Sequence, residues 1–167
     1  AMRKAFDSIR VGMTELELAA TIQEQFAAEG ATTEFAIIGA GPNGAFPHHQ
    51  AGARRIAEGD AIVIDIGGRT GGYPSDITRM AAVARAPQDY VKVHDIVERA
   101  VTAALKAARP GVAAKDVDAA ARTLIADAGY GEYFVHRTGH GLGIDGHEPP
   151  YITATSEVVL EEGMVFS

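Results

Sequence analysis

Two aspartates, Asp65 and Asp76, have the spacing and the setting that could support chemistry. Asp65 lies in the apolar segment 61–66, where strand alternation places it on the face opposite three isoleucines. Asp76 follows across a glycine-rich segment at the start of a second expected strand, so a hairpin would bring the two carboxylates together. Close carboxylates repel unless they share a proton or a cation. The spacing alone is equally compatible with a metal-binding pair and with hydrogen-bonded turn aspartates.

Five of the six histidines lie in two loop-like segments rich in glycine and proline, whereas His94 lies in a helical stretch and has no assigned role. The five are His48, His49, His136, His140 and His147. Histidines among turn-forming residues are not expected to be buried in a hydrophobic core. The cluster therefore favours a metal site or a proton-transfer site over structural histidines. Two aspartates with histidine form an oxygen-rich ligand set that suits manganese, cobalt or zinc.

Residues 39–44 match the glycine pattern of dinucleotide-binding loops, and Asp65 lies about 20 residues downstream, where a ribose-binding acid is expected. That function needs a helix that begins in the loop and directs its amides at the pyrophosphate. Pro42 and Pro47 interrupt the segment, and no apolar stripe follows it. We therefore interpret residues 39–44 as a tight glycine-rich turn and rank a dinucleotide oxidoreductase last.

The composition excludes several classes of protein. The chain has 167 residues, of which 47% are hydrophobic and 22% charged, which indicates one globular domain or at most two small halves. The absence of cysteine excludes disulfides, thiolate zinc sites and cysteine nucleophiles. A net charge of −7 argues against a nucleic-acid surface. No signal peptide or long apolar run is present, so we expect a cytoplasmic protein without a membrane partner.

The elements that must position these residues can also be predicted. Thr14 and Glu17 have the spacing of a capping box, and apolar residues at four-residue steps continue to Gly30, which predicts a helix. Two more apolar stripes predict helices over 90–105 and 117–128. The strands that we expect are 35–38, 61–66, 77–84, 158–160 and 164–166, with a loop at 39–50 and a turn at 67–75. Helices set apart from hairpin-linked strands favour an α+β fold.

Several ordered motifs resemble the prolidase and aminopeptidase P family of dinuclear metallopeptidases. They are Gly41-Pro42-Asn43, Pro47-His48-His49, Gly59-Asp60, Ile64-Asp65-Ile66-Gly67, Gly72 to Arg79, His136 to Gly143, His147-Glu148-Pro149-Pro150 and Leu160 to Val165. The resemblance extends from about Phe6 to the end of the chain. It implies the pita-bread fold, which methionine aminopeptidase and creatinase share.

By this resemblance Asp65, Asp76 and His140 would bind two divalent metal ions, with manganese expected and cobalt or zinc as alternatives. A hydroxide bridging the metals would attack the peptide carbonyl. Retention of all three ligands argues against creatinase, which uses no metal.

The resemblance also implies roles for three further histidines and a substrate class. His48 and His147 match family histidines that flank the substrate carbonyl, and His136 matches one near the leaving group. The implied substrate is a dipeptide or a longer peptide with proline in the second position, cut at the Xaa-Pro bond. The implied assembly is a homodimer.

The family completes its metal site with two glutamates, and the first is expected at the second residue after Ser167. We therefore expect residues 1–167 to be a partial catalytic domain, truncated at its C-terminus, that binds metal weakly and turns over little or no substrate. Two alternatives stay open. One is an exopeptidase of the methionine aminopeptidase type, and the other is a pita-bread module that binds a peptide without catalysis.

Overall fold

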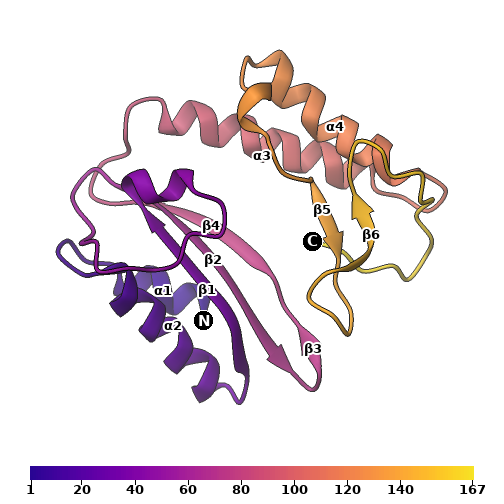
Figure 1. The fold of residues 1–167 in the computed structure, drawn as a ribbon. Helices are drawn as coiled ribbons and strands as arrows, with labels where there is room; N and C mark the ends of the chain where they lie inside the picture. The colour runs from indigo at the N-terminus through magenta and orange to yellow at the C-terminus, as the bar shows by residue number, and fades with distance from the viewer. The chain divides into compact units, whose positions relative to one another are not determined.

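The computed structural model describes all 167 residues, which divide into two compact units, residues 1–90 and 91–167. Both units combine helices with antiparallel strands, as the α+β expectation requires (Figure 1). None of the helices is long and apolar enough to cross a membrane. The elements of the first unit are α1 (Met2–Ser8), α2 (Glu15–Ala28), β1 (Thr32–Ala40), the 3₁₀ helix η1 (Gly41–Ala45), β2 (Ala61–Thr70), β3 (Tyr73–Pro74) and β4 (Ile77–Ala82).

Helix α2 begins with the capping box that the sequence predicts. The Glu17 N–H donates to Thr14 Oγ1 at 3.1 Å, and the Thr14 N–H donates to Glu17 Oε2 at 2.7 Å. The helix ends at Ala28, just before Gly30, whose φ of +73° suits a residue without a Cβ. Helix α1 was not predicted, because seven residues are too few to show a helical stripe.

The sheet of the first unit is organised around β2, which pairs with β1 on one side and with β3 and β4 on the other. β3 and β4 pair with β2 in a single register, so β2 to β4 form one continuous hairpin. Its turn consists only of Gly71 and Gly72, both at positive φ, as a two-residue type I′ turn requires. The predicted turn over 67–75 is therefore wrong in extent.

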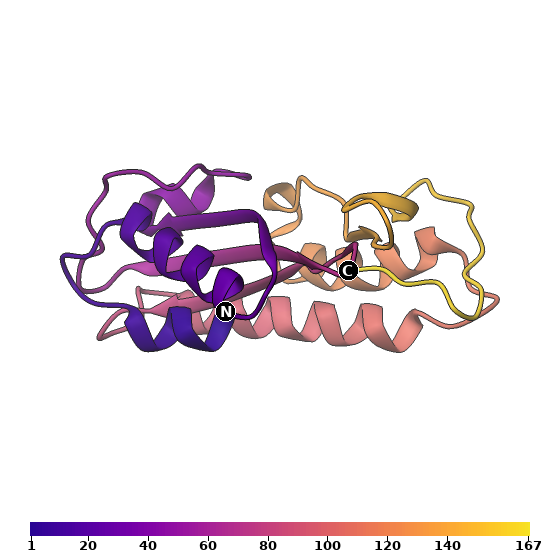
Figure 2. The same cartoon turned by 90° about the horizontal axis from the view of Figure 1, so that it is seen from below.

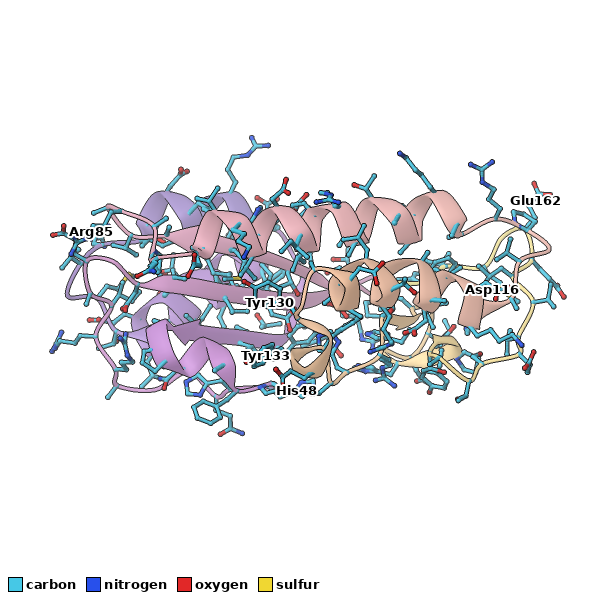
Figure 3. All side chains as sticks on the ribbon, turned by 90° about the horizontal axis from the view of Figure 1, so that it is seen from above. His48, Arg85, Asp116, Tyr130, Tyr133 and Glu162 are labelled. Atoms are coloured by element: carbon cyan, nitrogen blue, oxygen red, sulfur yellow. The ribbon has the colours of Figure 1, made fainter.

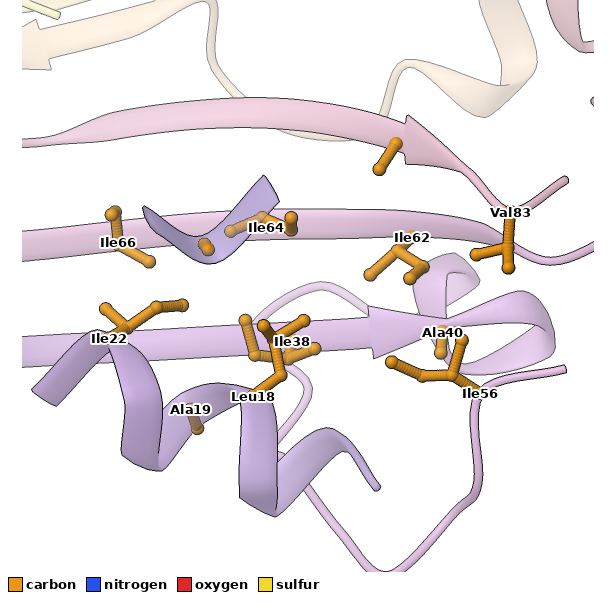
Figure 4. Packing of buried hydrophobic residues seen from close by; sticks show 12 residues of the cluster. Leu18, Ala19, Ile22, Ile38, Ala40, Ile56, Ile62, Ile64, Ile66 and Val83 are labelled. Carbon is orange, nitrogen blue, oxygen red and sulfur yellow. The ribbon is translucent and has the colours of Figure 1, made fainter. Parts of the chain in front are cut away.

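One face of this sheet carries the core of the unit. Leu18 and Ile22 of α2 pack against isoleucines of β1 and β2, as Figure 4 shows. The alternation predicted for 61–66 is confirmed, because Ile62, Ile64 and Ile66 are buried in this core. Figures 1 and 2 show α1 and α2 on the same side of the sheet. Asp65 thus belongs to the opposite face.

The second unit has a smaller core, in which α4 packs against a short two-stranded sheet. The predicted strands at 158–160 and 164–166 are wrong: Val159 and Phe166 form single bridges, to Ala113 and Gly141. The strands β5 and β6 were not predicted, because glycine, histidine and proline carry little strand signal. The elements of this unit are α3 (Tyr90–Ala107), α4 (Ala114–Asp127), the 3₁₀ helix η2 (Gly131–Tyr133), β5 (Gly139–Gly141) and β6 (Glu148–Ile152). The first residue of α3, Tyr90, is also the last residue of the first unit.

The two units build the entry to their second helix in the same way. The Gly12 N–H donates to the Ile56 carbonyl at 2.8 Å before α2, and the Gly111 N–H donates to the Leu160 carbonyl at 2.8 Å before α4. The two glycines have φ values of +86° and +89°. In both units this connection places the first turn of a helix beside a distant extended segment.

Candidate active site

Asp65 and Asp76 lie on the same face of the β2–β4 hairpin. Asp65 is paired with Thr78, and Asp76 precedes Thr78 by two residues in the same register. Such diagonal neighbours have Cα atoms about 7–8 Å apart and side chains that point to one face. The same register, which β3 continues, places Gly67 opposite Asp76, where it adds no side chain. The hairpin therefore places the two aspartates on one face as diagonal neighbours.

A hydroxyl holds the Asp65 side chain, and backbone hydrogen bonds fix the chain next to Asp76. Thr78 Oγ1 donates to Asp65 Oδ1 at 2.8 Å. Beside Asp76, the Ser75 N–H donates to the Gly68 carbonyl at 2.7 Å, and the Gly68 N–H donates to Ser75 Oγ at 3.1 Å. These bonds continue the ladder between β3 and β4 and fix the backbone next to Asp76.

The segment that carries His48 begins over the same face. A methyl group added to Gly44 of η1 would lie 3.2 Å from the Val63 side chain, and Val63 shares its face with Asp65. The expected loop over 39–50 thus contains a five-residue 3₁₀ helix, but no α-helix that could bind a pyrophosphate. His48 lies on the exposed loop that leaves η1 (Figure 3) and has a φ of +55°.

A fully buried carboxylate, Glu15, fixes this loop, and sequence reasoning missed it. It accepts hydrogen bonds from the Ala40 N–H, Asn43 Nδ2, His49 Nε2 and the Gly52 N–H at 2.8–3.0 Å. Burial alone would raise the pKa of Glu15, but the four donors outweigh it and hold the pKa below its usual value. Its position could have indicated the burial of Glu15, because Glu15 continues the apolar stripe of α2.

In the second unit His140 is buried in β5 between two glycines. Its Nδ1 lies 3.0 Å from the Gly141 carbonyl, which can only accept, so Nδ1 carries the proton and Nε2 is the nitrogen suited to a cation. A Cβ on Gly139 would overlap the Ser167 carbonyl, and one on Gly141 would overlap the carbonyls opposite. The His147 ring stacks on His140 at 4.0 Å between centroids, so these two predicted site residues meet.

His136 lies on an exposed segment whose backbone is anchored by an ion pair between Arg122, which is partly exposed, and the buried Asp118. Its ring meets Phe134 edge-on, with centroids 4.9 Å apart. Arg122 donates to the carbonyls of Phe134 and His136 at 2.8 and 3.0 Å, and its guanidinium also binds Asp118 through two hydrogen bonds. Thr138 Oγ1 donates to the same carboxylate at 2.7 Å. The segment around His136 is thus tied to α4 at three points.

Asp118 is the second buried acid that sequence reasoning missed. Its side chain is fully buried, because it lies with Ala121 on the otherwise apolar stripe of α4 that faces the core. Burial alone would raise the pKa of Asp118, but the hydrogen bonds from Arg122 and Thr138 hold the pKa below its usual value. Asp118 therefore stays ionised and paired in the folded protein.

The three expected metal ligands are divided between the units. Asp65 and Asp76 belong to the first and His140 to the second, and neither unit alone gathers three metal-binding side chains. The donor types fit the expected ions, because two carboxylates on one strand face and an imidazole fixed through Nδ1 are ligands of manganese, cobalt and zinc. Their roles as ligands stay predictions.

Comparison with known proteins decides the family. A model of metallopeptidase family M24 matches residues 1–167. The chain belongs to this family. The resemblance to prolidases and aminopeptidase P that the motifs indicate is thereby confirmed, and membership of a metallopeptidase family implies divalent metal ions.

Two curated relatives illustrate the similarity. The chain is 50% identical over 158 residues to "Probable dipeptidase PepE" of Mycobacterium tuberculosis, which covers 93% of this chain and 42% of the relative. It is 40% identical over 169 residues to "Xaa-Pro dipeptidase" of Pyrococcus furiosus, which covers 100% of this chain and 49% of the relative. The M24 chain therefore spans about half the length of the curated relatives it matches.

A solved structure agrees with the family. The prolidase from Pyrococcus furiosus superposes with a TM-score of 0.96 at 40% identity, over 99% of this chain and 50% of the prolidase chain. The expected pita-bread fold is thereby confirmed for the residues of this M24 chain.

Proposed function

We propose that the protein carrying this sequence hydrolyses the Xaa-Pro bond of dipeptides or of peptide N-termini, with divalent metal ions held by Asp65, Asp76 and His140. The observation that carries the proposal is the placement of Asp65 and Asp76 on one face of a single hairpin. A relative named Xaa-Pro dipeptidase, 40% identical over the whole chain, supports the substrate class.

Divalent cations at this site would activate water and stabilise the charge that develops on the substrate carbonyl oxygen. The contribution of the chain is to hold two negative charges side by side. Thr78 fixes one oxygen of Asp65, and the bonds between Ser75 and Gly68 fix the backbone before Asp76. Because the hairpin supplies this geometry in advance, little reorganisation is needed when cations bind.

Three histidines are assigned to the substrate in this proposal. His48 and His147 donate protons or hydrogen bonds to the carbonyl oxygen, and His136 acts near the leaving group. His147 is oriented by its stacking on His140. The Arg122 bond to the His136 carbonyl fixes its backbone, and the His136 ring packs edge-on against Phe134.

The expected ions are manganese, with cobalt or zinc as alternatives, because the ligand set is rich in oxygen. We propose that residues 1–167 alone hold them weakly and turn over little substrate, since they carry three of the ligand positions that the family uses. A homodimer and a cytoplasmic location complete the proposal.

The test is a peptidase assay on the protein that carries this sequence, not on residues 1–167 alone, after chelation and readdition of Mn²⁺. We expect Mn²⁺-dependent release of proline from an Xaa-Pro dipeptide and, at the same enzyme concentration, little release of methionine from Met-Ala-Ser. A preference for Met-Ala-Ser would support an exopeptidase of the methionine aminopeptidase type instead. If neither peptide is cleaved but an Xaa-Pro peptide binds, the protein is a binding module and the proposal is wrong.

A further inference from the structure

We propose that Glu15, acting through His49, is a positioning residue that sets the place of His48. The inference rests on the proposed function, which assigns His48 to the substrate carbonyl. It assigns a role to the second histidine of the Pro47-His48-His49 motif, which the proposed function leaves unused.

The first step is the closure of the loop by one carboxylate. Glu15 Oε1 accepts from the Ala40 N–H at 2.8 Å and from Asn43 Nδ2 at 2.9 Å. Its Oε2 accepts from His49 Nε2 and from the Gly52 N–H, both at 3.0 Å. Each oxygen thus receives two donors, which is the usual capacity of a carboxylate. The two ends of segment 40–52 and two side chains within it converge on a single group.

The second step concerns the direction of the bond between His49 and Glu15. An ionised carboxylate can only accept, so His49 Nε2 carries the proton and donates. The His49 ring is therefore fixed in one tautomer and one orientation. The His49 N–H also donates to the Phe46 carbonyl at 3.2 Å, which closes the turn that contains His48.

The third step is the backbone of His48. Its φ of +55° lies in the left-handed region, which a residue with a Cβ adopts when its surroundings impose it. The turn from Phe46 to His49 and the anchoring of His49 on Glu15 are such constraints, and they adjoin His48 directly. Loss of the His49 anchor should let His48 relax toward negative φ and move its ring.

Neither Glu15 nor His49 is suited to a catalytic role of its own. The Glu15 side chain is fully buried and its four acceptor positions are filled, so it cannot reach a substrate. The Nε2 proton of His49 is engaged by Glu15. Both residues therefore act on the reaction only through the loop that they hold.

The experiment compares His49→Phe, which keeps a ring but has no donor, with His49→Gln, whose amide N–H can still reach Glu15. His94→Phe is the matched control, because the His94 side chain on α3 is exposed. The activity of the protein that carries this sequence is measured on an Xaa-Pro dipeptide at saturating Mn²⁺. Because small misplacement of a catalytic group lowers the chemical step, we expect His49→Phe to reduce kcat about 10–100-fold with KM changed much less. His49→Gln should recover most of kcat, and His94→Phe should match the wild type.

A second readout is independent of activity. The NMR signals of the His48 ring in the 167-residue chain should shift in His49→Phe but stay near their wild-type positions in His49→Gln and His94→Phe. If His49→Phe does not fold, Glu15→Gln, which presents an amide N–H₂ to the donors, should give the same shift. Unchanged His48 signals, or His49→Gln no better than His49→Phe, would overturn the inference. If the wild type cleaves no Xaa-Pro peptide, the proposed function fails, and the NMR comparison still decides the role of His49.

Discussion

Replacing Asp118 by alanine is expected to lower the free energy of unfolding by about 3 kcal/mol at neutral pH, because the partly buried Arg122 guanidinium and the Thr138 hydroxyl lose a fully buried, charged acceptor. The Arg122 guanidinium loses two hydrogen bonds to the carboxylate, and Thr138 Oγ1 loses its acceptor. Arg122 would keep its bonds to the Phe134 and His136 carbonyls but without the group that orients it. Chemical denaturation at pH 7 measures the change.

Asp116→Ala is the matched control, since Asp116 lies on the same helix with its side chain exposed (Figure 3). We expect it to change the free energy of unfolding by no more than about 0.5 kcal/mol. Equal losses for the two variants would contradict the anchoring role of Asp118.

The effect of Asp118→Ala should also depend on pH in a defined direction. The folded protein holds the pKa of Asp118 below its usual value, although burial alone would raise it, because Arg122 and Thr138 donate to the ionised form. The stabilisation is therefore fully present above the unfolded pKa of about 3.9 and is lost as the pH falls through the lower folded pKa. The difference between wild type and variant should shrink below about pH 4 and stay constant from pH 5 to 8.

Asp65→Asn is expected to lower kcat/KM on an Xaa-Pro dipeptide by about 10³-fold, since loss of a metal ligand removes several kcal/mol of transition-state stabilisation. Asparagine keeps the size of the side chain and an oxygen that can accept from Thr78, so folding should survive. The assay uses the protein that carries this sequence at increasing Mn²⁺, and thermal unfolding is measured in parallel.

Two controls accompany this variant. Asp127→Asn changes an exposed carboxylate at the end of α4 and should keep wild-type activity and melting temperature. Thr78→Val removes the hydrogen bond to Asp65 but keeps the charge, so we expect a loss of only about tenfold. Full activity of Asp65→Asn in the presence of Mn²⁺ would exclude Asp65 as a ligand.

The sequence predicted those parts of the fold that depend on local patterns. The Thr14–Glu17 capping box located the start of α2, and the isoleucine alternation in 61–66 separated the core face from the face that carries Asp65. The placement of Asp65 and Asp76 followed from the hairpin. The extent of that hairpin was not predictable from glycine content alone, because only Gly71 and Gly72 form the turn and Gly67 and Gly68 continue the strand.

The features that the sequence did not predict depend on contacts between distant segments. Glu15 and Asp118 were missed because a charged residue on an apolar stripe does not reveal which donors compensate it. The donors of Glu15 come from the last residue of β1 and from the segment after it, and those of Asp118 include Thr138, twenty residues away. The strand β5 was missed because its glycines are required by backbone approach on both sides of His140, not by strand propensity.

The central claim is that Asp65, Asp76 and His140 hold the divalent ions, and a Mn²⁺ titration followed by NMR line broadening tests it most directly. Mn²⁺ broadens the signals of nuclei close to it, so the titration identifies the residues that bind the ion, whether or not substrate is turned over. In the 167-residue chain we predict broadening centred on these three residues, absent at His94, and weak binding throughout. Broadening centred elsewhere, for example at the exposed Glu162, or tight stoichiometric binding of two ions would contradict the account.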